Sequence, residues 1–409
     1  MSVRRRSRIV FLSAALLGAS LAGALVLPQV AIAAQTVSAK VGKPLQEAQA
    51  AAKAGDYNTA IAKAKEAQAM PGRTAYEDYV INQFLAYAYN AKRDYRNAMA
   101  ATEATLSYSG MPRADRAKTL KTLAQQAYQI KDYGKTITYA TRYQNEAGAD
   151  ADLQLLVANC YYQQGNYRQS LAGTKALLDS AEASGRAPSQ KVLALFLSSA
   201  YQLKDGPSIK RALFRLVELY PSDGYWNTLF REINNEGLGA YAQLDLMRIQ
   251  KKKNLLKTDD DWFNYAKLAF ALNLPGDAKA ILDEGFQKKI LGNAPNNRDQ
   301  RLQQVVNEAV TKDQAILESD DATYAKGTAG DNDIQVGQRF ASYGKYDRAI
   351  AAITRGLAKQ GVSNPDQAKL DLGRIQLLAG KTDQGRRTLQ SIKTDSSTRD
   401  VARLFLITG

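Results

Sequence analysis

The chain has 409 residues, with no histidine and a single cysteine, and these two facts limit its chemistry. Without histidine it cannot build a Ser-His-Asp or Cys-His nucleophile pair, a histidine-bearing zinc site or a histidine acid–base catalyst. Cys160 lies on the apolar side of an expected helix, which is typical of a small buried hydrophobe. We therefore expect no catalytic residue, no cofactor and no bound metal.

Carboxylates are the remaining candidates for catalysis, because glycosidases use two acids at a fixed separation. Acidic residues cluster at 259–261 and at 318–321. Both clusters are expected at helix ends, where a carboxylate accepts hydrogen bonds from free backbone N–H groups and complements the helix dipole. We expect capping or solvation for both clusters, and a carboxylate hydrolase is the enzymatic alternative.

One repeated pattern organises the segments that carry these residues. Residues 153–178 have apolar side chains at helical spacing on both sides of Gly165, Asn166 and Tyr167, which predicts two antiparallel helices joined by a tight turn. The small residues Ala158 and Ser170 stand where the two helices must come close. One such hairpin cannot bury its own apolar faces, so it needs neighbours of the same kind.

The same pattern recurs along most of the chain, with a small or compact residue three places after the turn tyrosine as its anchor. The clear anchors are Ala60, Ala98, Thr136, Ser170 and Ala349, and weaker copies have Ile209, Ala242, Ala278 and Gly385. The two tryptophans, Trp226 and Trp262, each lie 16 positions before an anchor. This pattern resembles the tetratricopeptide repeat, a helix-turn-helix unit of about 34 residues. The resemblance implies an all-α fold, a right-handed α-solenoid of stacked helix-turn-helix hairpins.

The repeats and their interruption predict four parts. Residues 1–33 are an expected signal peptide, 34–291 an array of about seven hairpins, and 331–409 a C-terminal pair of hairpins. Between them, residues 292–330 show no legible repeat, and 298–318 predicts one long polar helix. This part is either an irregular helical insertion or hinge, or a degenerate repeat. Ala51 and Gln376 replace the large residue of the pattern in the first and last units, which suggests end caps with wet outer faces.

The first 33 residues have the features of an export leader. Arginines at 4, 5, 6 and 8 precede an apolar run at 9–27, and Ala31-Ile32-Ala33 matches a small-residue cleavage site. We expect cleavage after Ala33 and a periplasmic or secreted protein. The alternative is an N-terminal membrane anchor, because the apolar run of 19 residues is just long enough to span a bilayer.

The charge balance indicates what kind of partner the chain would attract. The formal charge is +15, and removing the four leader arginines leaves +11. Such a balance favours acidic proteins, anionic lipid head groups or envelope polysaccharides, and export makes nucleic acid an unexpected partner. The only run of three basic residues after the leader, 251–253, is expected to end a helix.

The family resemblance also implies where a partner binds. In tetratricopeptide superhelices the first helices of successive hairpins line a concave groove that holds peptides. Carried over by position, the groove residues are Gln83, Tyr87, Asn90, Lys118, Lys121, Gln125, Tyr128, Asn159 and Tyr162. Tyrosines, amides and lysines suit an extended peptide or a glycan, although each tyrosine could instead pack on the next hairpin. We expect a non-enzymatic exported scaffold or adaptor in the cell envelope that binds a protein or peptide. The alternative is a basic module that binds glycans or a membrane surface.

Overall fold

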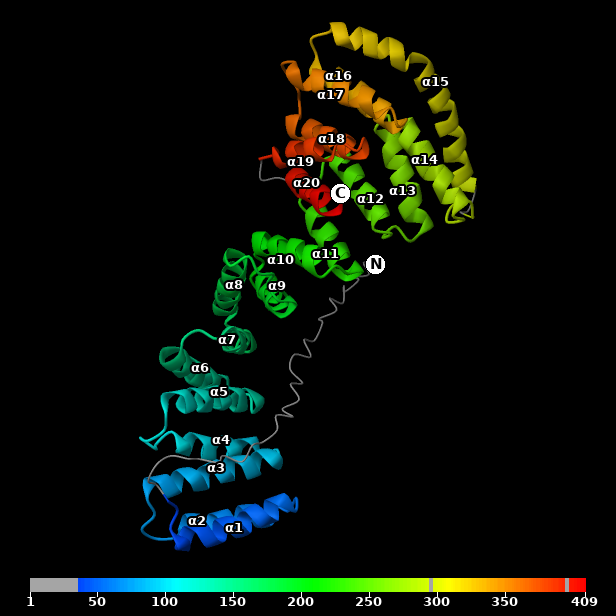
Figure 1. Cartoon of the computed structure of the whole chain (residues 1–409). Coiled ribbons are helices and arrows are strands. Elements are labelled where there is room, and N and C mark those ends of the chain that lie inside the picture. The colour runs from blue at the N-terminus through cyan, green and yellow to red at the C-terminus, as the bar shows by residue number, and fades with distance from the viewer. Residues whose placement is uncertain (1–35, 294–296, 394–396) are drawn as a thin grey trace, which may run out of the picture. The chain divides into compact units, whose positions relative to one another are not determined.

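The computed structural model describes residues 36–293, 297–393 and 397–409, and these residues form twenty α-helices and no strand (Figure 1). The prediction of an all-α helical-repeat fold is therefore confirmed. The expected signal peptide at 1–33 lies outside the described residues. None of the described helices combines the length and the apolar character that crossing a membrane requires.

The chain divides into two compact units, which we describe separately. Unit 1 comprises the described residues up to Lys135 together with Asn145–Ala147, and unit 2 comprises Thr136–Gln144 and Gly148–Gly409. Unit 1 contains α1 (Ala39–Lys53), α2 (Tyr57–Ala69), α3 (Ala75–Ala91), α4 (Tyr95–Thr105), α5 (Arg113–Gln129) and both ends of α6 (Tyr133–Ala147). Unit 2 contains the middle of α6 and then α7 (Ala151–Gln163), α8 (Tyr167–Ala183), α9 (Gln190–Leu203), α10 (Gly206–Leu219), α11 (Asp223–Asn234), α12 (Ala240–Lys252), α13 (Asp259–Ala271), α14 (Pro275–Gln287), α15 (Arg298–Lys326), α16 (Gly330–Ser342), α17 (Tyr346–Ala358), α18 (Pro365–Leu378), α19 (Thr382–Gln390) and α20 (Ser397–Thr408).

The anchor residues lie in the buried contacts between helices. Every anchor is buried in the second helix of its hairpin, as predicted: Ala60, Ala98, Thr136, Ser170, Ile209, Ala242, Ala278, Ala349 and Gly385. Close approach explains why most of them, unlike Ile209, are small. A Cβ atom added to Gly385 would lie 2.9 Å from the carbonyl oxygen of Gly373, and one added to Gly173 would lie 3.3 Å from the Cβ atom of Ala158. A larger side chain at these places would push the two helices apart.

All the turns between paired helices except the one from α11 to α12 place a left-handed residue directly before the cap of the second helix. In the first hairpin Gly55 is left-handed, with φ of 80°, and Asp56 then begins α2 by accepting a hydrogen bond of 3.0 Å from the Thr59 backbone N–H. Arg93, with φ of 61°, takes the same place before Asp94 in the second hairpin. The corresponding left-handed residues of later turns are Lys131, Gly165, Lys204, Asn273, Gly344 and Gly380. A left-handed residue followed by a helix cap is therefore the local rule that reverses the chain.

Unit 2 folds back on itself at its C-terminal end. Helix α20 packs against α11, α12, α18 and α19, and lies beside α12 in Figure 1. Its Val401 and Leu404 belong to the same hydrophobic core as Trp226 and Leu229 of α11. Gln376 of α18 is also buried and accepts a hydrogen bond of 2.7 Å from Thr388, so the prediction of a wet outer face at this position is wrong. Its partner Thr388 belongs to α19, and α20 packs against both helices of this last hairpin, so the array does not end at them.

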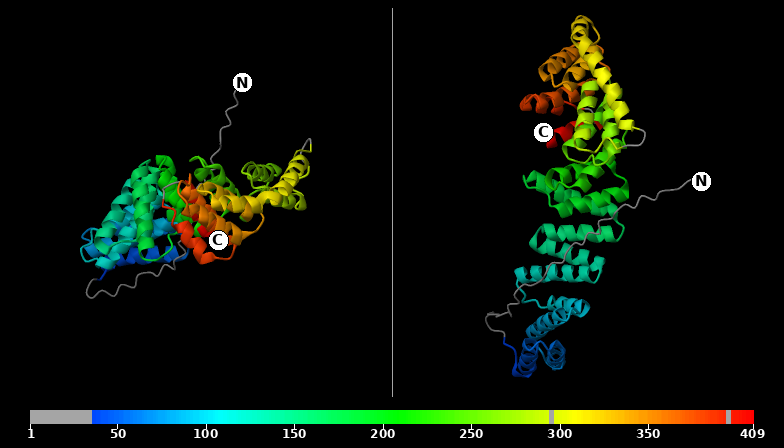
Figure 2. Two further views of the ribbon diagram at one scale, coloured as in Figure 1. Left: turned by 90° about the horizontal axis from the view of Figure 1, so that it is seen from above. Right: turned by 90° about the vertical axis from the view of Figure 1, so that its right-hand side faces the viewer.

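Helix α15 occupies the stretch where no repeat is legible. It spans 29 residues and runs on to Lys326, well beyond the end predicted at 318. It packs against α13, α14, α16 and α17, and Figures 1 and 2 show it in yellow along the flank of these helices. Only one narrow face is buried, formed by Asp299, Val306, Asp313 and Leu317. Three of these residues are seven positions apart, the spacing of a helix that packs along a single seam.

Candidate functional site

Neither the lone thiol nor a metal site offers chemistry in the part of the chain that the structure describes. Cys160 is fully buried in α7, and burial raises the pKa of its thiol to about 12, so the reactive thiolate is suppressed. No group of three or more histidine, cysteine or carboxylate side chains within the described ranges could hold a metal ion.

The first acidic cluster caps a helix, as predicted. Thr258 accepts a hydrogen bond from the Asp261 backbone N–H, and the Asp261 carboxylate accepts one of 2.9 Å from the Thr258 backbone N–H. This reciprocal pair is a capping box at the start of α13. The basic run is also where it was expected, because Lys251 and Lys252 form the last turn of α12.

The second acidic cluster does not lie at a helix end, and that prediction is wrong. Residues 318–321 lie inside α15, where their carboxylates form ion pairs with basic residues of the next hairpin. Glu318 and Asp321 both pair with Arg348 of α17, at 2.7 and 2.8 Å, and Asp320 pairs with Arg339 of α16 at 2.6 Å. The helix continues because these acids are satisfied by side chains of another element instead of by free backbone donors. The cluster therefore attaches α15 to its neighbours.

The predicted groove residues of α3 lie on one side of the helix and are partly exposed. Gln83 donates a hydrogen bond of 2.5 Å to the Tyr79 hydroxyl. The ring of Tyr87 lies edge-on to that of Tyr57, with centroids 6.2 Å apart, and burial raises the pKa of its hydroxyl. Asn90 is exposed and accepts a hydrogen bond of 3.4 Å from Gln126 of α5. Tyr87 thus combines packing with a remaining exposed edge.

The predicted groove residues of α5, also in unit 1, are partly or fully exposed like those of α3. Lys118 and Gln125 are exposed, while Lys121 and Tyr128 are half-buried. Lys118 forms a long ion pair of 3.5 Å with Asp115, and Tyr128 packs on the turn tyrosine Tyr133 with ring centroids 5.9 Å apart. The spacing of 118, 121, 125 and 128 places these four side chains on one face. A hydrogen bond joins Asn90 of the α3 row to Gln126, the residue after Gln125 of the α5 row.

Asn159 and Tyr162 are the predicted groove residues of α7, in unit 2. Both are half-buried. Asn159 accepts a hydrogen bond of 3.3 Å from Gln163, and Tyr162 meets the turn tyrosine Tyr167 edge-on at 5.2 Å. A tyrosine late in the first helix therefore packs against the turn tyrosine of its own hairpin in both α5 and α7. Each of these two tyrosines therefore packs against a neighbouring ring and still has part of its side chain exposed.

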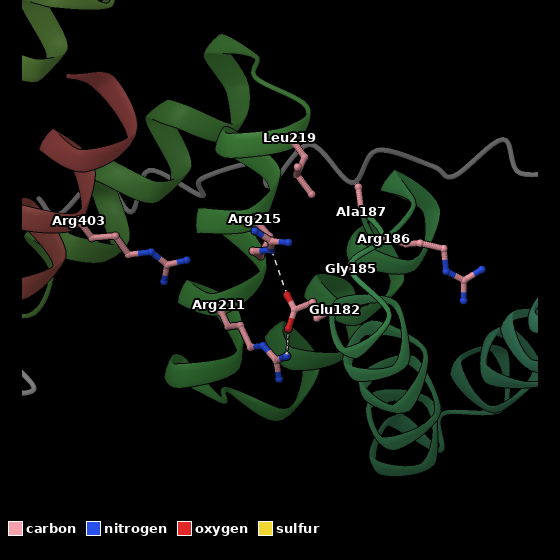
Figure 3. Close-up of a pocket in the computed structure, with 8 residues that line it drawn as sticks. All are labelled: Glu182, Gly185, Arg186, Ala187, Arg211, Arg215, Leu219 and Arg403. Carbon is pink, nitrogen blue, oxygen red and sulfur yellow. Dashed lines mark hydrogen bonds and ion pairs between the residues drawn. The ribbon is translucent and has the colours of Figure 1, made fainter. Parts of the chain in front are cut away.

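Unit 2 contains a second candidate site that the sequence did not reveal, an arginine-lined pocket of about 640 Å³ (Figure 3). Its walls come from the end of α8, the loop after it, α10 and α20. Glu182 pairs with Arg211 at 2.9 Å and with Arg215 at 3.0 Å. The only sequence indication is the spacing of Arg211 and Arg215, which places them on one face of a helix. Arg403 arrives from α20, far along the chain.

The two tryptophans are buried where the repeat pattern places them. Trp226 of α11 and Trp262 of α13 are 4% and 3% exposed, and in each case the next helix carries a buried anchor. The chain is built of helix-turn-helix repeats that resemble the tetratricopeptide unit. The family resemblance stated from the sequence is therefore confirmed at the level of the repeat.

We compared this repeat protein with known proteins. No protein-family model matches the sequence, and no curated protein matches it. Among solved structures, it is similar to a tetratricopeptide repeat protein from Parabacteroides merdae, with 12% identity, a TM-score of 0.34, and coverage of 83% of this chain and 100% of that one. It is also similar to the TPR2AB domain of yeast Sti1 in complex with pHSP90, with 10% identity, a TM-score of 0.26, and coverage of 72% of this chain and 99% of that one. It is similar as well to the tetratricopeptide domain of P58(IPK), with 13% identity, a TM-score of 0.26, and coverage of 90% of this chain and 98% of that one.

Proposed function

We propose that the protein is a non-enzymatic scaffold or adaptor that binds a protein or extended peptide along the first helices of its hairpins. The observation that carries this proposal is the row of partly exposed tyrosine, amide and lysine side chains on α3 and α5. Each row lies beside a buried face that fixes its helix in place. A preformed surface of this kind loses little conformational entropy on binding.

The chemistry of these side chains suits a peptide. Tyr87 and Tyr128 offer flat apolar edges with polar tips, while Asn90 and Gln125 can exchange hydrogen bonds with a peptide backbone. Lys121 adds a positive charge that favours acidic residues in the partner. The absence of histidine from the sequence supports a binding role over the commonest acid–base catalysis.

We further propose that this scaffold works in the cell envelope. The support is the sequence pattern at 1–33, in which a basic region, an apolar run and a small-residue cleavage site follow one another. Amino-terminal sequencing of the protein purified from an envelope fraction tests this step. A mature chain that begins near residue 34 is expected, and an intact leader would indicate a membrane anchor.

A pull-down experiment tests the binding role itself. The mature chain, residues 34–409, is used to capture partners from envelope extract, and the complexes are washed at low and at high salt. A discrete protein retained at high salt is expected, because a tyrosine-lined surface depends little on ionic strength. Retention of polysaccharide or lipid at low salt only would favour the glycan- or membrane-binding alternative.

A pair of variants then places the binding surface. Tyr128→Ala combined with Lys121→Ala should weaken retention of the partner by about tenfold, since central aromatic contacts dominate interfaces. Tyr143→Ala combined with Lys135→Ala is the control, because it removes the same two residue types from α6, a second helix. Equal retention of the partner by both double variants would exclude the α5 surface. A large fall in melting temperature for the first double variant would assign those two residues to packing.

A further inference from the structure

The arginine-lined pocket of unit 2 has no acidic residue on one of its walls. Arg403 of α20 enters the pocket opposite Arg215 of α10 (Figure 3). Its guanidinium Cζ atom lies 4.1 Å from the ring centroid of Phe214, so the flat group is stacked and held in place. Among the described residues, no carboxylate forms an ion pair or hydrogen bond with Arg403. Its N–H donors are therefore available to a ligand.

The other two arginines that point into the pocket are already paired. Arg211 contacts Asp179 at 2.7 Å and Glu182 at 2.9 Å. Arg215 contacts Glu182 at 3.0 Å and Glu218 at 2.7 Å. These pairs fix the guanidinium groups and hold one side of the pocket rigid. Arg186 also lines the pocket, but its side chain points away from the other arginines in Figure 3.

One arginine of the pocket lacks an acidic partner. Of the four arginines that line the pocket, Arg211 and Arg215 are paired with acids and the Arg186 side chain points away, so Arg403 is the one that faces the pocket without a bonded acid. A carboxylate carries a single negative charge at neutral pH, whereas a phosphate group carries nearly two. The guanidinium fork of Arg403 matches the two oxygens of a carboxylate.

We propose that this pocket binds the carboxylate of an acidic residue within a peptide segment of a protein partner. The pocket is far larger than a carboxylate, and Leu219 and Ala187 add apolar surface to its wall. These features fit a side chain with its neighbouring residues better than a free ion. The inference rests on the proposed role in protein binding, and adds a contact surface formed by α10 and α20.

The electrostatic environment of Arg403 supports this proposal. Burial lowers the pKa of Arg403, and Arg215 and Arg399 act in the same direction, while Glu218 and Asp400 oppose them only through space. Asp400 is already paired with Lys210 at 2.8 Å. A partly buried cation without a bonded acceptor is costly, and a bound carboxylate would supply that acceptor.

A direct binding assay tests the pocket without knowledge of the partner. The probe is a fluorescein-labelled peptide, Gly-Ala-Glu-Leu-Glu-Gly, and the neutral control replaces both glutamates by glutamine. Fluorescence anisotropy should show binding of the acidic peptide alone to the mature chain. Arg403→Gln should weaken that binding about tenfold, because it removes a charge-assisted bidentate contact. Arg399→Gln, one turn earlier on α20 and exposed, is the matched control and should change the affinity less than about twofold.

A second variant guards against a folding defect in the first. Ala187→Trp places a bulky ring on an exposed loop at the pocket wall without touching Arg403, and it should abolish binding of the probe. Equal losses from Arg403→Gln and Arg399→Gln, or normal binding by Ala187→Trp, would overturn the proposal.

Competition identifies the ligand group. Acetate and inorganic phosphate are titrated at fixed ionic strength, and acetate should displace the probe at least as well as phosphate. Displacement by phosphate alone would overturn the carboxylate assignment in favour of a phosphate group. Variants of Tyr128 and Lys121 in unit 1 should leave probe binding unchanged, so the pocket and the proposed α5 surface can fail independently.

Discussion

Arg339 of α16 and Asp313 of α15 form an ion pair of 2.7 Å in which the two side chains are only 5% and 8% exposed. The same guanidinium contacts Asp320 at 2.6 Å, and the Tyr343 hydroxyl donates to the second oxygen of Asp313 at 2.7 Å. Polar contacts therefore attach the middle of α15 to α16 and to the residue that follows it, at a seam where an apolar residue would be expected.

Loss of Arg339 should release this part of α15. Arg339→Leu leaves Asp313 buried without its cation, which we expect to cost about 3–5 kcal/mol in the free energy of unfolding of unit 2. The exposed pair of Arg348 with Glu318 provides the control, because Arg348→Leu should cost at most about 1 kcal/mol. Chemical denaturation gives the two free energies, and faster amide exchange across residues 306–321 should accompany only the first variant. Similar losses for both variants would contradict a dominant role for the buried pair.

Asp371 should make the stability of unit 2 depend on pH. This residue of α18 is 1% exposed, and burial together with the nearby Asp245 raises the pKa of its carboxyl to about 6, against the effect of Arg374. The folded state therefore holds a proton that the unfolded chain releases near pH 4, so this residue's contribution to stability falls as pH rises from about 4 to about 6. Asp371→Asn should raise the melting temperature at pH 7.5 and change it little at pH 4.5. An equal shift at both pH values would show that the effect is unrelated to titration.

Glu77 should have the opposite pH dependence in unit 1. Its carboxylate accepts hydrogen bonds from the Ser38 hydroxyl and the backbone N–H groups of Thr74 and Ser38, and these lower its pKa to about 2. The bonds from Ser38 measure 2.6 and 2.8 Å and join the start of α1 to α3. Because the folded pKa is depressed, the stabilisation is complete above about pH 5 and is lost as pH falls toward 2.

Glu77→Gln should therefore lower the resistance of unit 1 to denaturant at pH 7, and the difference from the unmodified chain should shrink at pH 3. Circular dichroism during urea titration measures both. Glu66→Gln, on the exposed side of α2, is the control and should have little effect at either pH. A constant difference at both pH values would argue against the ionised form of Glu77 as the stabilising species.

The hairpin turns predict opposite effects for two substitutions in unit 1. Arg93 has φ of 61° and should gain about 0.5–1 kcal/mol of stability on replacement by glycine, which adopts this conformation without strain. Gly55 has φ of 80° and open space around its missing Cβ, so Gly55→Ala should destabilise through backbone strain alone, by about 1 kcal/mol. Thermal unfolding of both variants measures these changes, and a stabilising Gly55→Ala would refute the shared turn geometry.

The local parts of the fold were predictable because they depend on neighbouring residues. The turn at Gly165, the capping acids at 259–261 and the small anchors follow from helix periodicity and turn chemistry, and the structure places them as expected. Burial of Cys160 follows from the same periodicity. These features need no knowledge of what lies far away in the sequence.

Features that join distant segments could not be predicted in this way. Residues 318–321 read as a helix end because their partners, Arg339 and Arg348, lie in the next hairpin and cannot be matched to them by spacing. Likewise, the pocket depends on the fold-back that carries Arg403 to α10. The rows on α3 and α5 were predicted by position, and their role in binding remains a prediction for the variants described above.

The fold-back of α20 also affects how unit 2 can form during synthesis. Trp226 and Leu229 of α11 share their core with Val401 and Leu404 of α20, so the apolar face of α11 leaves the ribosome long before the residues that cover it exist. The intervening helices must all be translated first, which gives this core a high contact order and slow closure. In the meantime that face is a target for chaperones or for self-association. A carboxy-terminal truncation would make this transient exposure permanent.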